Sequence, residues 1–163
     1  MKECKEYLKL EIFQKCNIEI SDFQLDSESK EYSGCRFVVN GRKIISRFSK
    51  ITPKKAGQFV AFYKRNSTNI IEPFHQNDAL DLFIINCRSA KDFGLFIFPK
   101  EILIQKGIIS NHNNEGKRAF RVYPNWDIAQ SKQAINTQKW QLEYFVNFEK
   151  EAAACERLSK FLK

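Results

Sequence analysis

The sequence predicts an α/β fold in one domain, residues 1–163, with a central mixed sheet that helices cover on both sides. Residues 82–85 and 94–98 are short apolar runs between turn residues, which is typical of strands buried on both faces. Helical spacing of apolar residues near both ends of the chain predicts helices to cover them. No repeat, low-complexity tract or linker divides the chain, and its 163 residues suit a single domain.

The first part of the chain predicts a helix, a turn-rich segment and a hairpin. Apolar residues recur at helical spacing over residues 2–16, which predicts the first helix. Residues 26–33 are polar and typical of a turn. Residues 35–39 and 43–48 then flank Asn40-Gly41, and both positions of such a two-residue turn favour positive φ. We therefore expect a β-hairpin here.

The middle of the chain predicts further strands and a short helix. Residues 58–63 read as a third strand, followed by a polar excursion over residues 67–78. After the two buried strands, a helix is expected from Pro99, because proline suits a first helical turn. It should run to Lys106 and end at Gly107.

The stretch GKRAFRVYPNWD, residues 116–127, predicts a strand with two different faces. Side chains alternate along a strand, so Lys117, Arg121 and Tyr123 share one face while Phe120 and Val122 share the other. The second face suits a core. The first combines cations for phosphate with a flat ring for a base. An ordinary edge strand with a solvated face is the alternative.

The C-terminal part predicts a long helix over residues 128–148 and a further helical segment over residues 152–162. On the long helix, Trp140 and Tyr144 lie opposite the arc expected to face the sheet. We expect a neighbouring element to cover Trp140. Tyr144 is expected on the surface, because its hydroxyl tolerates water.

Composition places the chain among globular proteins with polyanionic partners. It has 27 Lys+Arg against 19 Asp+Glu, a formal net charge of +8, which favours nucleic acid over a membrane surface. No apolar run has the length of a membrane span, and the first residues show no secretion signal, so we expect a cytoplasmic protein. The five cysteines lack any C-x-x-C spacing and are expected to be reduced: Cys4, Cys16, Cys35, Cys87 and Cys155. Two distant histidines without a cysteine companion argue against a zinc site.

One arrangement of residues suggests a metal-dependent nuclease. Asp78 and Asp81 open the strand at residues 82–85, and Lys100 follows the next strand, so carboxylates could hold Mg²⁺ while the lysine steadies developing charge. Phe98 stands where such sites carry the acidic partner, and Glu11 is the residue that could compensate. The alternative is that Asp81 caps a strand end and Lys100 is a solvated cation.

Five segments together resemble one bacterial family. They are KITPKK-x-GQFV-x-FYKR from Lys50, DL-x-II from Asp81, FIFPK from Phe96, GKRAFRVYP-x-WD from Gly116 and TQ-x-WQ from Thr137. In this order, across about two-thirds of the chain, they resemble the MepB family. The resemblance implies a bacterial cytoplasmic protein whose relatives are encoded beside a multidrug exporter. It also implies a fold similar to restriction-endonuclease-like domains, with an αβββαβ core, and it brings no assigned catalytic residues.

Three functions follow as hypotheses. The first is binding of nucleic acid, with single-stranded DNA or RNA favoured, on a nuclease-like scaffold without an evident catalytic site and without a cofactor. Its expected surface contains Lys50, Lys54, Lys55, Tyr63, Lys64, Arg65, Lys100, Lys117, Arg118, Arg121, Tyr123 and Trp126. The second is the Mg²⁺-dependent nuclease of Asp81, Lys100 and either Glu11 or Asp78. The third is a small-molecule or protein-interaction domain linked to drug resistance, anchored by Trp126, Trp140 and Tyr144.

Overall fold

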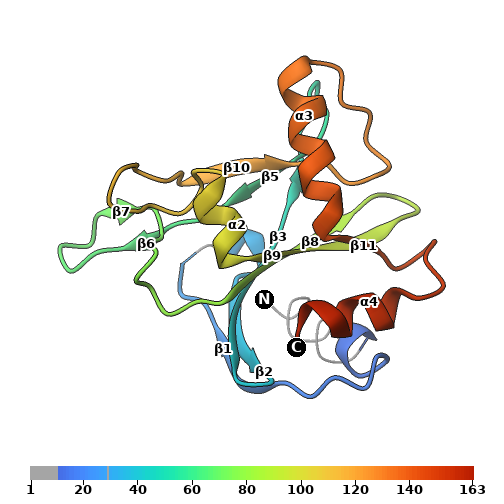
Figure 1. Ribbon diagram of the computed structural model, residues 1–163, viewed down its shortest axis with the longest axis horizontal. Coiled ribbons are helices and arrows are strands. Elements are labelled where there is room, and N and C mark those ends of the chain that lie inside the picture. Colours follow the sequence, from blue (N-terminus) through green and yellow to red (C-terminus); the bar gives the residue numbers. More distant parts are fainter. Residues whose placement is uncertain (1–10, 29) are drawn as a thin grey trace.

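A six-stranded mixed sheet forms the centre of the protein. The computed structural model describes residues 11–28 and 30–163, and its main sheet has the strand order β1-β2-β3-β8-β9-β11 (Figure 1). These strands are β1 (Ser21–Leu25), β2 (Cys35–Val39), β3 (Arg42–Phe48), β8 (Leu82–Arg88), β9 (Phe93–Pro99) and β11 (Phe145–Asn147). The pair β3–β8 is parallel and the other pairs are antiparallel. The predicted α/β fold with a central mixed sheet is confirmed.

Smaller elements surround this sheet. A three-stranded sheet has the order β10-β5-β4, and β6 pairs with β7. Their bounds are β4 (Lys50–Ile51), β5 (Gln58–Ala61), β6 (Lys64–Arg65), β7 (Ile71–Glu72) and β10 (Ala119–Val122). The helical elements are η2 (Lys30–Tyr32), α2 (Lys100–Gln105), α3 (Lys132–Gln141), η3 (Leu142–Tyr144) and α4 (Ala154–Phe161). No helix in the described part of the chain combines the length and the apolar character needed to cross a membrane.

The strands β8 and β9 are buried on both faces, as their apolar runs predict. Towards one face, their side chains join a core with Ile12, Phe13 and helix α4. The three-stranded sheet and α2 lie on the other side (Figure 1), and the strand side chains that point there join a core with them. Helices were expected on both sides, but a second sheet forms much of the cover on this face. The reason is that β5 and β10 present Val60, Phe120 and Val122 to the core.

The locally encoded elements are confirmed. The hairpin β2–β3 turns at Asn40 and Gly41, whose φ angles are 52° and 78°. Helix α2 follows Pro99 and stops before Gly107, and α4 lies within the predicted segment 152–162. The expected first helix, residues 2–16, falls mostly outside the described residues.

The expected long helix over residues 128–148 is wrong. Helix α3 starts only after Ser131, whose hydroxyl accepts a hydrogen bond from the Ala134 amide at 3.1 Å. The chain leaves the helix after Gln141 and forms β11, an edge strand antiparallel to β9. Aromatic and β-branched residues such as Phe145 and Val146 favour strands, and pairing with β9 decides the outcome here. Ile135, which belongs to the arc of the predicted long helix that was expected to face the sheet, is 49% exposed.

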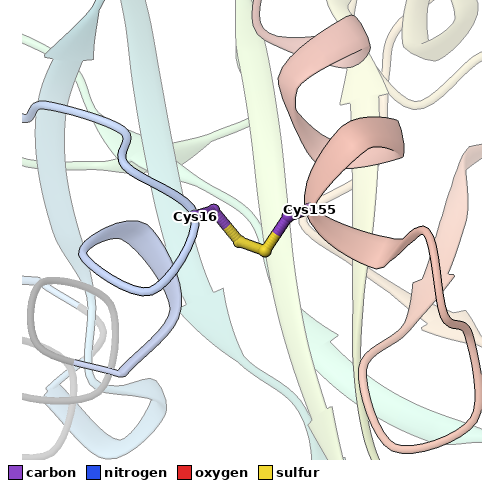
Figure 2. Close-up of a disulfide and its surroundings, with 2 residues drawn as sticks. All are labelled: Cys16 and Cys155. Carbon is purple, nitrogen blue, oxygen red and sulfur yellow. A yellow bond between two sulfur atoms is a disulfide. The ribbon is translucent and has the colours of Figure 1, made fainter.

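The prediction of reduced thiols is also wrong for most described cysteines. Cys16 and Cys155 form a disulfide with Cα atoms 5.0 Å apart, which joins the segment before β1 to α4 (Figure 2). Cys35 is disulfide-bonded as well. Cys87 is free and buried, and burial raises the pKa of its thiol to about 12. Scattered cysteines give no sign in the sequence that the two ends of the chain pack together.

Candidate functional site

A trough runs beside helix α3. Three hollows of about 340, 560 and 310 Å³ lie along it. The first and second share Lys106, Gln133, Thr137 and Trp140 in their walls, and the first and third share Arg121, Tyr123, Ser131 and Ala134. Because neighbouring hollows share lining residues, they adjoin one another, and we call the three together the α3 trough.

The α3 trough is electropositive. Its cations are Lys55, Lys106, Lys117, Arg121 and Lys132. Among the described residues, its walls contain no aspartate or glutamate, and no carboxylate lies within 4.0 Å of these five cations. Positive groups without nearby acids raise the local concentration of anions, most strongly at low salt.

Strand β10 and the residues on either side of it supply one wall of the trough, in the way the alternation predicts. Lys117, Arg121 and Tyr123 line the trough. Phe120 and Val122 are 8% and 0% exposed and join the core beneath. The period of two in the sequence therefore separates the two faces, except that Phe120 also lines the first hollow.

Two glutamines hold α3 against this strand. The Gln141 side chain accepts from the Tyr123 amide and donates to the Arg121 carbonyl, both at 2.9 Å. The Gln138 side chain donates to the carbonyl oxygens of Pro124 and Asp127, at 3.0 and 2.9 Å. An amide side chain carries both a donor and an acceptor, so it can take the place of a neighbouring peptide group. The helix, and with it one wall of the trough, is thus fixed to β10.

The loop before β5 lines the third hollow through Lys55 and Ala56. Arg121 donates to the Ala56 carbonyl and to the Thr52 hydroxyl, which ties this loop to β10. Gly57 has φ +80°, and a Cβ atom there would lie 2.6 Å from the Tyr123 ring. Glycine is therefore needed at this position for two reasons: it allows the positive φ angle, and it leaves room for the Tyr123 ring.

Replacing Gly57 with alanine is expected to destabilise the protein by about 1–3 kcal/mol and to displace the Tyr123 ring. Urea denaturation would measure the loss. Gly41→Ala is the matched control, because Gly41 has φ +78° but a Cβ atom there would meet nothing within 4 Å. Equal losses in the two variants would contradict a role for the contact with Tyr123.

Aromatic residues contribute unevenly to the trough. Trp140 lines it, with its ring centroid 5.4 Å from that of Phe98 and 5.3 Å from the Lys106 Nζ. Trp126 instead packs edge-on against Phe145, at 5.7 Å. Tyr144, expected on the surface, is half-buried between Phe98 and Phe161. Of the rings proposed for ligand contact, Trp140 and Tyr123 therefore lie in the trough.

Several predicted cations lie elsewhere and are paired with acids. The shortest of these contacts are Lys50–Glu31 at 3.0 Å, Lys64–Asp78 at 2.7 Å, Arg65–Glu28 at 2.6 Å and Arg118–Glu115 at 3.1 Å. Burial lowers the pKa of Lys64, but hydrogen bonds and charge interactions with Asp78 and Glu72 outweigh it, and the pKa is raised. Four more of the predicted residues do not belong to the walls of the trough in the described part of the chain: Lys54, Tyr63, Lys100 and Trp126. Of the twelve predicted residues, Lys55, Lys117, Arg121 and Tyr123 come together in it.

The residues of the nuclease hypothesis have structural partners. Asp81 accepts from the Lys43 amide at 2.8 Å, as the strand-cap alternative predicts, and Lys100 Nζ donates to the Asp78 carbonyl at 2.6 Å. Phe98 is fully buried in the core. Glu11 lines a separate hollow beside Cys155. Within residues 11–28 and 30–163, no three His, Cys, Asp or Glu side chains are grouped so that they could hold a metal ion.

The residues predicted from the sequence to form the site did not include Lys106 or the polar residues of α3. Lys106 follows α2, and it reaches the trough only because α2 and α3 lie close together. Gln133, Thr137 and Trp140 recur at spacings of four and three residues, which places them on one face of α3. That spacing is the signal that could have identified this wall.

Comparisons with known proteins agree with this architecture. A family model described as MepB-like matches residues 26–147. A crystal structure of MepB is 33% identical, with a TM-score of 0.79 over 92% of this chain and 97% of that one. A bacterial homing endonuclease is 12% identical, with a TM-score of 0.47 over 87% of this chain and 89% of that one, which is too remote to carry an argument. No curated protein matches the chain.

Proposed function

The chain belongs to the MepB-like family, and from the α3 trough we propose that it binds nucleic acid, with single strands favoured over duplexes. The observation that carries this proposal is a row of three adjoining hollows, the α3 trough, with five cations and no acid among the described residues of its walls. Cationic grooves of this kind follow a phosphate backbone, and aromatic rings within them stack on bases.

The position of the rings favours single strands. Tyr123 and Trp140 are half-buried in the trough, so a base must leave its own stack to contact them. In a duplex, the bases are stacked inside and the backbone faces outward. A single strand offers both phosphate and free base faces, and stacking on an aromatic side chain contributes about 1–3 kcal/mol per base.

Reversing two charges in the trough is expected to weaken binding strongly. In Lys55→Glu/Lys117→Glu, two phosphate contacts are lost and two repulsions are introduced. Fluorescence polarisation with a labelled single-stranded oligonucleotide, at several salt concentrations, would measure the change. If all five cations contact phosphate, the wild-type slope of log K against log[salt] should be roughly −3 to −4, at about −0.7 per contact. The double variant should have a shallower slope and a lower affinity.

The control is Lys91→Glu/Lys160→Glu. It changes the net charge by the same amount but alters two exposed lysines outside the trough. It should bind nearly as well as the wild type, because only its long-range field differs. Equal weakening in both double variants would show non-specific attraction and overturn the assignment to the trough. Unchanged binding in the trough variant, or affinity insensitive to salt, would overturn the proposal as well.

We also propose that the protein is located in the cytoplasm, since nucleic acid is abundant there. The Cys16–Cys155 bridge counts against a cytoplasmic location, because disulfides seldom persist in a reducing cytoplasm. If the bridge were reduced, the trough residues, which belong to other segments of the chain, would still be held by the contacts of Gln138, Gln141 and Arg121.

A further inference from the structure

The two ends of the α3 trough differ in chemistry. We propose that the end at Trp140 is a pocket for a nucleobase, while the end at Lys55 and Arg121 holds phosphate. This inference rests on the proposed function and adds to it which part of the ligand lies where. A strand would then be bound with one base turned onto Trp140 and its backbone directed along β10 towards Arg121.

The Trp140 end carries hydrogen-bonding groups as well as a ring. Beside Lys106 and Lys132, its walls contain Trp140 and three neutral polar side chains of α3. These are Gln133, Asn136 and Thr137. Together with Trp140 they occupy positions i, i+3, i+4 and i+7, so they form a single stripe on the helix. Amide and hydroxyl groups around a flat ring match the edges and face of an unpaired base.

These polar side chains are not used by the protein itself. No hydrogen bond joins the side chains of Gln133, Asn136 or Thr137 to another described residue. The next face of the same helix differs, because Gln138 donates to carbonyl oxygens of the turn after β10 and Gln141 donates to β10 itself. Helix α3 therefore has one row of amides that builds the fold and a second row that faces the open trough.

The other end suits phosphate. Lys55 and Arg121 line it together with Gln130, Ser131 and the Tyr123 ring. The contacts with Thr52 and Ala56 hold the Arg121 guanidinium in place, and its remaining N–H groups are free to donate. The amino end of α3 begins at Ser131, so its dipole adds to the positive potential there. A fixed guanidinium binds phosphate through two parallel hydrogen bonds.

Lys106 lies at the Trp140 end of the trough. Its Nζ lies 5.3 Å from the centre of the Trp140 ring, which is a cation–π contact at an exposed site. Such a contact is weak, and the long side chain can leave the ring to pair with a phosphate. The ring face that it covers would then be open to a base.

The tryptophans make the test specific. The chain has two, and Trp126→Phe leaves Trp140 as the sole tryptophan, whose fluorescence can be excited selectively over that of the tyrosines. The probes are a short single-stranded oligonucleotide and a strand of equal length and charge whose sites are abasic. We expect the first to quench Trp140 fluorescence and the second to bind about 5- to 150-fold more weakly without quenching, which corresponds to one stacked base.

Further variants separate the two ends. Gln133→Ala/Asn136→Ala should lower affinity for the base-bearing strand and leave the abasic strand unchanged, whereas Lys55→Glu should weaken both. Trp140→Phe, with Trp126 retained, should remove the quenching while circular dichroism shows an intact fold. Equal affinities for the two strands, without quenching, would overturn the base pocket but leave nucleic-acid binding standing. Binding of neither strand would overturn the proposed function itself.

Discussion

Replacing Asp26 with alanine is expected to lower the free energy of unfolding by about 3–5 kcal/mol. The Arg47 side chain is fully buried, and its Nη2 lies 2.7 Å from the Asp26 carboxylate. Burial lowers the pKa of Arg47, and the charge of Asp26 acts in the opposite direction. Without that carboxylate the guanidinium stays charged, since arginine does not give up its proton in proteins, and it has no counter-charge in the core. Chemical denaturation would measure the loss.

Glu28→Ala is the control for this prediction. Glu28 belongs to the same segment and pairs with Arg65 at 2.6 Å, but the two side chains are 30% and 35% exposed. Ion pairs in contact with water contribute only about 0–1 kcal/mol, so this variant should be nearly as stable as the wild type. A small loss in Asp26→Ala, comparable to that of Glu28→Ala, would mean that water reaches Arg47.

The Cys16→Ser/Cys155→Ser variant is expected to be about 2–5 kcal/mol less stable than the oxidised protein. The bridge joins residues 139 positions apart, so it removes many conformations from the unfolded chain. The midpoint of unfolding in guanidinium chloride, without reductant, gives the difference. Adding a reductant should then lower the midpoint of the wild type more than that of the variant. A variant that unfolds at the wild-type midpoint would show that the bridge does not constrain the chain.

Local signals in the sequence predicted local structure well. Asn40-Gly41 identified the β2–β3 hairpin, and Pro99 and Gly107 bracketed α2, because turn and cap residues act on their immediate neighbours. Residues 145–148 were misread as helix, since a short apolar run fits either state and only its partner β9 decides.

The site was predicted only in part, because its composition also depends on contacts between distant segments. Alternation along β10 correctly brought Lys117, Arg121 and Tyr123 together. The sequence does not show that Arg65 pairs with Glu28, 37 residues away, which removes it from the candidate surface. In the same way, it does not show that Lys106 and the polar stripe of α3 meet across the trough. Contacts between distant segments decide which charged residues remain available.

The glutamine contacts of α3 have a consequence for the behaviour of the protein in solution. A sheet edge with free amides and carbonyls is a template on which another molecule can add a strand, and this is a common route to aggregation. On the outer side of β10, Gln141 already occupies the Tyr123 amide and the Arg121 carbonyl. At these two backbone groups the edge nearest the trough is therefore closed to pairing with another strand.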